Sequence, residues 1–137
     1  MNYININEEK TNNSLEYQQF VRENQGNGFL RIRAYGASEA IPIEGISIIV
    51  STPIGDNNVI FFEGKTDASG MIKRLELPAP KRNSDNLITP KWTIYNIKAS
   101  YEGSDINYKV NLYDGVCVQQ IINMVPDNPV RGYNYGR

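Results

Sequence analysis

Short runs of alternating apolar and polar residues follow one another along most of the chain. Seven such runs have the length of a β-strand, and Gly, Pro, Asn or Asp residues separate them. The runs cover residues 29–34, 46–51, 59–63, 71–77, 92–101, 106–112 and 116–124. Alternation buries one face of a strand and leaves the other face free, which suits two sheets packed face to face. The pattern therefore predicts an all-β fold, an antiparallel β-sandwich of about seven strands that occupies residues 27–126.

Turn chemistry supports this prediction at two places. In the segment Thr66-Asp67-Ala68-Ser69-Gly70, the Asp67 carboxylate can accept a bond from the backbone two residues on, and Gly70 can take a positive φ. Asp114-Gly115 is a dipeptide typical of tight β-hairpins. We expect a structural turn at residues 66–70 and a hairpin that joins the last two strands.

The first strand carries charge on one of its two faces. Leu30, Ile32 and Ala34 point to one side, and Arg31 and Arg33 point to the other. The two arginines form either an anion site or a solvated strand face. The solvated face is the favoured interpretation, because no other basic residue is near them in the sequence.

Helical spacing of apolar residues occurs in residues 13–24. Asn13 is placed to cap this helix, and Glu16 stands three residues later in the capping-box position. Tyr17 and Phe20 begin an apolar stripe on one face, and Gly26 is suited to end the helix. We therefore expect one short N-terminal helix within an extension of residues 1–26, packed on an open end or an edge of the sandwich.

Both chain ends contain candidate partner-binding residues. Ile4 and Ile6 would share one face of a short extended segment, which is either a loose end or a strand added to the edge of a neighbouring sheet. The tail of residues 127–137 is flexible or held by a partner, and it contains Tyr133 and Tyr135.

Composition limits the classes of function. The 137 residues are 40% hydrophobic and 21% charged with a net charge of -1, which fits one globular domain. No basic surplus is present, so nucleic-acid binding is disfavoured. The polar start lacks the pattern of a signal peptide, and no apolar run is long enough to span a membrane. We expect synthesis in the cytoplasm and no membrane insertion.

The residue types that usually carry catalysis are scarce. The chain contains no His and one Cys, so His-dependent triads and a Cys/His zinc site are excluded. Cys117 is predicted to be a small buried residue of a strand, and no internal disulfide is possible. The carboxylates occur singly, and a hydrolase built from two of them that converge in space ranks last. We predict a protein that is not an enzyme and has no cofactor and no metal.

Several motifs together resemble a known family. Pro42-Ile43-Glu44-Gly45 matches a P-x-x-G motif, Thr66–Gly70 matches T-D-x-x-G, and Ala99–Gly103 matches a third turn motif in part. In this order the chain is similar to the transthyretin-like (prealbumin-like) sandwich, also called the carboxypeptidase regulatory-like domain. The resemblance implies a transthyretin-like topology without catalysis of its own.

Two further segments, Leu77-Pro78-Ala79-Pro80 and Ile122-Asn123-Met124-Val125-Pro126, resemble the N-terminal prosegment of clostridial spore cortex-lytic enzymes and their free-standing relatives. This implies an interaction or regulatory module at the spore or cell envelope, with a lytic enzyme or an envelope component as its partner. The alternative is a structural subunit of a fibre or coat that assembles with itself through its N-terminal strand.

Overall fold

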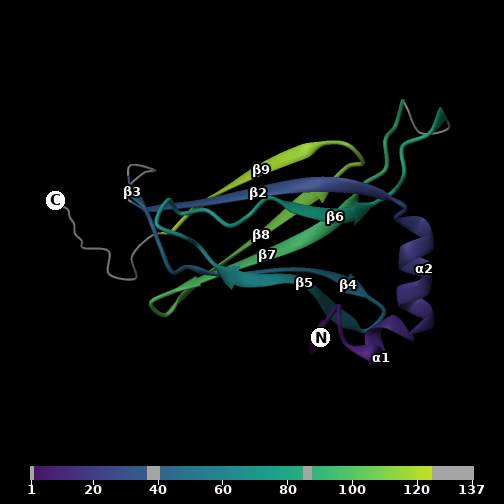
Figure 1. Cartoon of the computed structure of the whole chain (residues 1–137), viewed down its shortest axis with the longest axis horizontal. Coiled ribbons are helices and arrows are strands. Elements are labelled where there is room, and N and C mark those ends of the chain that lie inside the picture. The colour runs from purple at the N-terminus through teal and green to yellow at the C-terminus, as the bar shows by residue number, and fades with distance from the viewer. Residues whose placement is uncertain (1, 37–40, 85–87, 125–137) are drawn as a thin grey trace.

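The computed structural model describes residues 2–36, 41–84 and 88–124, which form a two-sheet β-sandwich with two short helices (Figure 1). The prediction of an all-β sandwich is confirmed, with nine strands in the described part of the chain. The strands are β1 (Asn2–Asn5), β2 (Gly26–Gly36), β3 (Ile41–Pro42), β4 (Ser47–Ile54), β5 (Asn57–Lys65), β6 (Leu75–Ala79), β7 (Thr93–Tyr101), β8 (Ser104–Leu112) and β9 (Cys117–Asn123). The helices are α1 (Glu9–Asn12) and α2 (Leu15–Glu23).

The two sheets are built around different strands. Sheet A has the order β1-β5-β4-β7-β8. Sheet B is centred on β2, which pairs with β3, β6 and β9. Neighbouring strands are antiparallel as predicted, except that β1 runs parallel to β5 and β9 runs parallel to β2. Neither parallel pair joins strands that are adjacent in the sequence.

The predicted hairpin between the last two strands is wrong. Gly115 does have a positive φ of 78°, and the Val116 N–H donates to the Tyr113 carbonyl at 3.1 Å. The turn instead carries the chain from β8 of sheet A to β9 of sheet B. Turn residues set a local reversal of the chain, whereas the burial of Ile122, which is 0% exposed, depends on the pairing of β9 with β2.

Strand alternation builds the core as the pattern predicts. Leu30, Ile32 and Ala34 of β2 are fully buried, and so are Val50 of β4 and Ile97 of β7, which stand opposite each other in sheet A. Each large side chain of this kind contributes roughly 1.5–3 kcal/mol when it leaves water. The inner faces of the two sheets therefore supply most of the stability.

The turn at residues 66–70 is confirmed. Asp67 Oδ1 accepts bonds from the Ser69 N–H at 2.9 Å and the Met71 N–H at 3.0 Å, and Gly70 has a φ of +75°. The buried Thr66 adds a contact that the sequence does not reveal. Its hydroxyl donates to the Ile43 carbonyl at 2.7 Å and accepts from the Ile46 N–H at 3.0 Å.

Several local predictions need correction. The strand expected at residues 71–77 begins only at Leu75 and continues to Ala79 as β6. The extension contains two helices where one was expected, and Gly26 begins β2 instead of ending the helix, whose last residue is Glu23.

Two side chains also differ from the prediction. Ser14, not Asn13, caps α2, because its hydroxyl accepts a bond from the Tyr17 N–H at 3.1 Å. Cys117 is exposed and not buried. It stands opposite Phe29 in the β2–β9 pair, and this register places its side chain on the outer face of sheet B.

The N-terminal arm, defined as residues 2–25, combines β1, α1 and α2. Figure 1 shows α2 across one end of the sandwich, in agreement with the predicted packing on an open end. Three aromatic rings connect α2 to the core. The centre of the Phe20 ring lies 5.9 Å from the centre of the Phe61 ring, and the centres of the Phe61 and Tyr95 rings are 5.6 Å apart. Phe61 is the extra residue where the β4–β5 register shifts, and this irregularity allows its ring to reach Tyr95.

Candidate binding site at the α2 end of the sandwich

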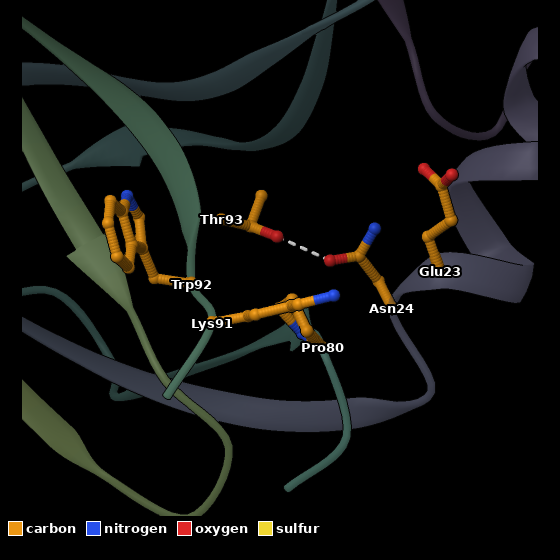
Figure 2. Close-up of a pocket in the computed structure, with 6 residues that line it drawn as sticks. All are labelled: Glu23, Asn24, Pro80, Lys91, Trp92 and Thr93. Carbon is orange, nitrogen blue, oxygen red and sulfur yellow. Dashed lines mark hydrogen bonds between the residues drawn. The ribbon is translucent and has the colours of Figure 1, made fainter. Parts of the chain in front are cut away.

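A hollow of about 510 Å³ lies where α2 meets the start of β7 (Figure 2). Three segments that are distant in the sequence form its walls: the end of α2, the residue after β6, and the start of β7. Its lining residues are Glu23, Asn24, Pro80, Lys91, Trp92 and Thr93. The hollow brings an aromatic ring, a cation, a carboxylate and an amide together in an open site.

Asn24 fixes one wall of this hollow. Its Nδ2 donates to the Phe20 carbonyl at 2.8 Å, which satisfies one of the free carbonyls at the end of α2. Its Oδ1 accepts a bond from the Thr93 hydroxyl, drawn in Figure 2. One side chain therefore ties the end of α2 to Thr93, the first residue of β7. Trp92, which directly precedes Thr93, is thereby kept near the end of α2.

Trp92 and Lys91 directly precede β7, and Figure 2 shows their side chains projecting to opposite sides of the chain. The indole of Trp92 is 47% exposed, and its ring lies 5.9 Å from the ring of Tyr113 at an angle of 51°. The Lys91 side chain extends toward α2 and Pro80. A half-exposed ring that is supported by a second ring offers a rigid apolar surface to a ligand.

A second hollow of about 200 Å³ continues the first one and shares Glu23, Pro80 and Lys91 with it. Its other lining residues are Arg22, Gln25, Lys81 and Asn83. We call the two hollows together the α2-end groove. Three basic side chains and one carboxylate line it, so the groove favours a ligand that combines polar or anionic groups with an apolar ring or chain.

Asp114 clamps the segment that borders this groove. Its two carboxylate oxygens accept bonds from the Arg82 N–H and the Asn27 N–H, each at 3.0 Å. These bonds, the one from Arg82 first, hold the pKa of the Asp114 carboxyl below its ordinary value of 3.8. A Cβ on Gly26 would lie 2.5 Å from the Asp114 carboxyl carbon, so glycine leaves the room for this clamp.

The candidate residues from the sequence lie elsewhere. Ile4 stands opposite Val59 in the parallel pair of β1 and β5, and the Ile6 N–H donates to the Ile60 carbonyl at 3.0 Å. Both side chains are half-buried against the protein's own sheet. Ile4 lines another hollow of about 350 Å³ beside α1. Tyr133 and Tyr135 lie outside the described residues.

Sequence reasoning assigned no binding role to Trp92 and left the role of residues 81–90 open. The one signal available was the pairing of the chain's only tryptophan with Lys91 directly after that polar segment. Its neighbours Asn24 and Tyr113 are far away in the sequence, so the site could not be assembled from spacing.

The carboxylates of the sequence have structural contacts in several cases. Asp67 organises its turn, Asp105 lies 3.8 Å from the Lys98 ammonium group, and Asp114 forms its clamp. Across residues 2–36, 41–84 and 88–124, no group of three or more His, Cys, Asp or Glu side chains is placed to hold a metal ion. Within the same residues, no helix has the length and apolar character needed to cross a membrane.

The comparisons with known proteins found matches among solved structures. No protein-family model and no curated protein sequence matches this chain. Transthyretin from Sparus aurata has a similar solved structure, with 16% sequence identity and a TM-score of 0.43. The similarity covers 69% of this chain and 90% of that one. The relation to spore cortex-lytic enzymes stays a prediction.

Proposed function

We propose that this protein is a non-catalytic β-sandwich interaction module that binds its partner in the α2-end groove. The observation that carries the proposal is the half-exposed Trp92 beside Lys91, in a hollow whose wall is fixed by the Asn24–Thr93 bond. A supported aromatic ring with convergent polar groups is the usual composition of a binding site. It also resembles the exposed aromatic anchors of protein interfaces.

The identity of the partner rests on the sequence resemblance. Prosegments of spore cortex-lytic enzymes accompany a catalytic domain that acts on peptidoglycan. By this resemblance we infer a role at the spore or cell envelope, with a lytic enzyme or an envelope component as the partner. The balance of three basic residues and one carboxylate in the groove is compatible with the carboxylate groups of such a partner.

The only tryptophan of the sequence lies in the proposed site, so its fluorescence reports on binding directly. Soluble fragments of spore cortex peptidoglycan and the catalytic domain of a cortex-lytic enzyme are the two probes, and for the second probe residue 92 is labelled as 5-hydroxytryptophan so that it is excited apart from the probe's own tryptophans. We expect one of them to shift the Trp92 emission in a saturable way, and Lys91→Ala to weaken that binding about tenfold because one charged contact is lost.

Lys109→Ala is the matched control, because Lys109 is an exposed lysine of β8 that lines neither hollow of the groove. It should bind like the unchanged protein. Saturable binding of either probe that is equally strong in the Lys91→Ala variant would place the contact outside the groove. No emission change with either probe would contradict the envelope partner.

A second candidate function is self-assembly through exchange of β1, and the position of this strand favours it. β1 has four residues, adds to the edge of sheet A in parallel, and leaves Tyr3 48% exposed. A short edge strand of this kind could leave its own β5 and pair with β5 of another copy in the same register. Exchange in a chain of copies does not close, so it produces fibres.

Mass in solution tests this second candidate. Full-length protein should form large assemblies, and the double variant Ile4→Asp, Ile6→Asp should be monomeric, because charge on these half-buried positions prevents docking on β5. The control is Ile94→Asp, since Ile94 is 44% exposed on β7, and β4 and β5 separate this strand from β1. A full-length monomer at high concentration would eliminate self-assembly through β1.

A further inference from the structure

Three arginine side chains gather on the outer face of sheet B. Arg31 and Arg33 occupy alternate positions of β2, on the face that points away from the core. The Arg74 guanidinium lies 4.5 Å from the centre of the Phe29 ring, which belongs to the same face. The Arg33 guanidinium lies 5.3 Å from the centre of the Tyr35 ring. We call Arg31, Arg33 and Arg74 the arginine face.

The arginine face has unmet capacity for anions. None of its three residues forms an ion pair within the part of the chain that the structure describes. The residues of β9 opposite Arg31 and Arg33 are the uncharged Gln119 and Ile121. The Nε of Arg33 is buried and has no acceptor among the described residues.

The fold brings further basic residues to Arg31 and Arg33 that are distant from them in the sequence. The favoured interpretation of Arg31 and Arg33 was a solvated face without basic neighbours, but the folded chain adds Arg74 and, one residue before it, the exposed Lys73. Glu76 is the one carboxylate opposite Phe29 on β6, and it pairs with none of the arginines. The local balance of charge is therefore positive on a protein with a net charge of -1.

We propose that the arginine face binds an extended acidic segment of a protein partner, with Asp or Glu at every second position. Residues two apart on a strand are separated by about 6.8 Å, and the same spacing separates alternate side chains of an extended peptide. Carboxylates on one face of such a peptide would meet Arg31 and Arg33 in register. Arg31 is exposed and can meet its carboxylate through two parallel bonds, whereas Arg33, whose Nε is buried, would use the N–H groups of its Nη atoms.

This surface is separate from the α2-end groove, so the inference goes beyond the proposed function. The experiment uses full-length protein and two labelled peptides of the same composition. In one peptide Glu and Thr alternate, and in the other the Glu residues are consecutive, so that half of their carboxylates point away from the face. Fluorescence anisotropy measures both affinities. We expect the alternating peptide to bind about tenfold more tightly, with affinity that falls as salt is added.

Single-residue variants test whether the peptide contacts the arginine face. Arg31 is exposed and stacks on no ring of the described residues, so Arg31→Gln leaves the fold intact and should weaken binding of the alternating peptide about tenfold. Arg31→Lys should weaken it nearly as much, because lysine lacks the planar fork. Arg74→Gln should act in the same direction, and Lys109→Gln and Lys91→Ala should have no effect.

Three results would overturn the proposal. The first is equal binding of the two peptides, and the second is full affinity of the Arg31→Lys variant, which would reduce the contact to a point charge. The third is Arg31-dependent binding of inorganic polyphosphate with no binding of the alternating peptide, which would assign the surface to phosphate. If no partner binds at the α2-end groove, the peptide affinities of the arginine face stay the same. A failure of one proposal can therefore be told apart from a failure of the other.

Discussion

The sandwich body and the N-terminal arm are stabilised in different ways. In the body, inner-face residues such as Ile32, Val50 and Ile97 are 0% exposed and pack between two sheets. In the arm, α2 has no fully buried residue. Thr11 of α1 is the one fully buried residue among residues 2–25. The body is therefore stabilised by burial of apolar area, and the arm by a few separate contacts.

This difference places the candidate site at a junction. The arm is attached by the pairing of β1 with β5, which the Ile6–Ile60 backbone bond continues, by the Phe20–Phe61 ring contact and by the Asn24–Thr93 bond. Two of these three attachments lie at the α2 end of the sandwich. A weakly held element over a rigid body can detach or adjust without unfolding the whole protein. Variants of the sandwich body, of the contact between Phe20 and Phe61, and of the Asp114 carboxylate test this difference in stabilisation.

The largest effect should come from Gly70→Ala in the body. Gly70 has a φ of +75°, and a Cβ there would lie 2.4 Å from the Ala34 carbonyl oxygen. We expect a loss of about 2–4 kcal/mol in the free energy of unfolding, from the left-handed backbone and the clash together. Denaturant unfolding measures it.

Gly103→Ala is the matched control for this change. Gly103 has a φ of +85°, but nothing lies within 4 Å of the added Cβ, so only the backbone cost of about 1–2 kcal/mol remains. Equal losses for the two variants would show that the contact with Ala34 does not constrain the body.

A smaller effect is expected from Phe20→Ala, which breaks the attachment of the arm. Phe20 is half-buried, so the variant should lose about 2 kcal/mol, less than a fully buried Phe would. Amide hydrogen exchange should become faster in α2 and stay slow in β2 and β7. Leu15→Ala, at a position that is 77% exposed, is the control and should change neither quantity. Faster exchange throughout the body would mean that arm and body unfold as one unit.

The smallest effect concerns pH and the Asp114 clamp. Backbone bonds lower the pKa of this carboxyl in the folded state, so the ionised form stabilises the fold above the ordinary value of 3.8 and that stabilisation is lost as the pH falls below it. Asp114→Asn should lower the Tm slightly at neutral pH, because an amide cannot accept both N–H groups. Thermal unfolding followed from neutral to acidic pH should show the two Tm values converging. A constant difference would exclude the carboxylate as its source.

The sequence predicted much of the fold but did not identify the candidate site. The helix at residues 13–24 was placed correctly at the end of the sandwich, although its cap moved by one residue to Ser14. The sequence leaves Ile4 either in a loose end or in a strand that joins a neighbouring sheet, and in the structure it belongs to β1, which pairs with the chain's own β5. Trp92 gained its significance only from Tyr113 and Asn24, which the fold brings to it.

The sequence by itself determined most of the strands of the two sheets, their buried faces and the turn at residues 66–70. These features depend on side-chain alternation and on bonds such as that from the Ser69 N–H to Asp67, two residues apart. Only the tertiary structure decided that β9 joins β2, that Arg74 meets Phe29, and that Asn24 reaches Thr93. The Asn24–Thr93 bond spans 69 residues and the Asp114–Asn27 bond spans 87. Local pattern contains no information on such pairings, because burial of the whole core selects them.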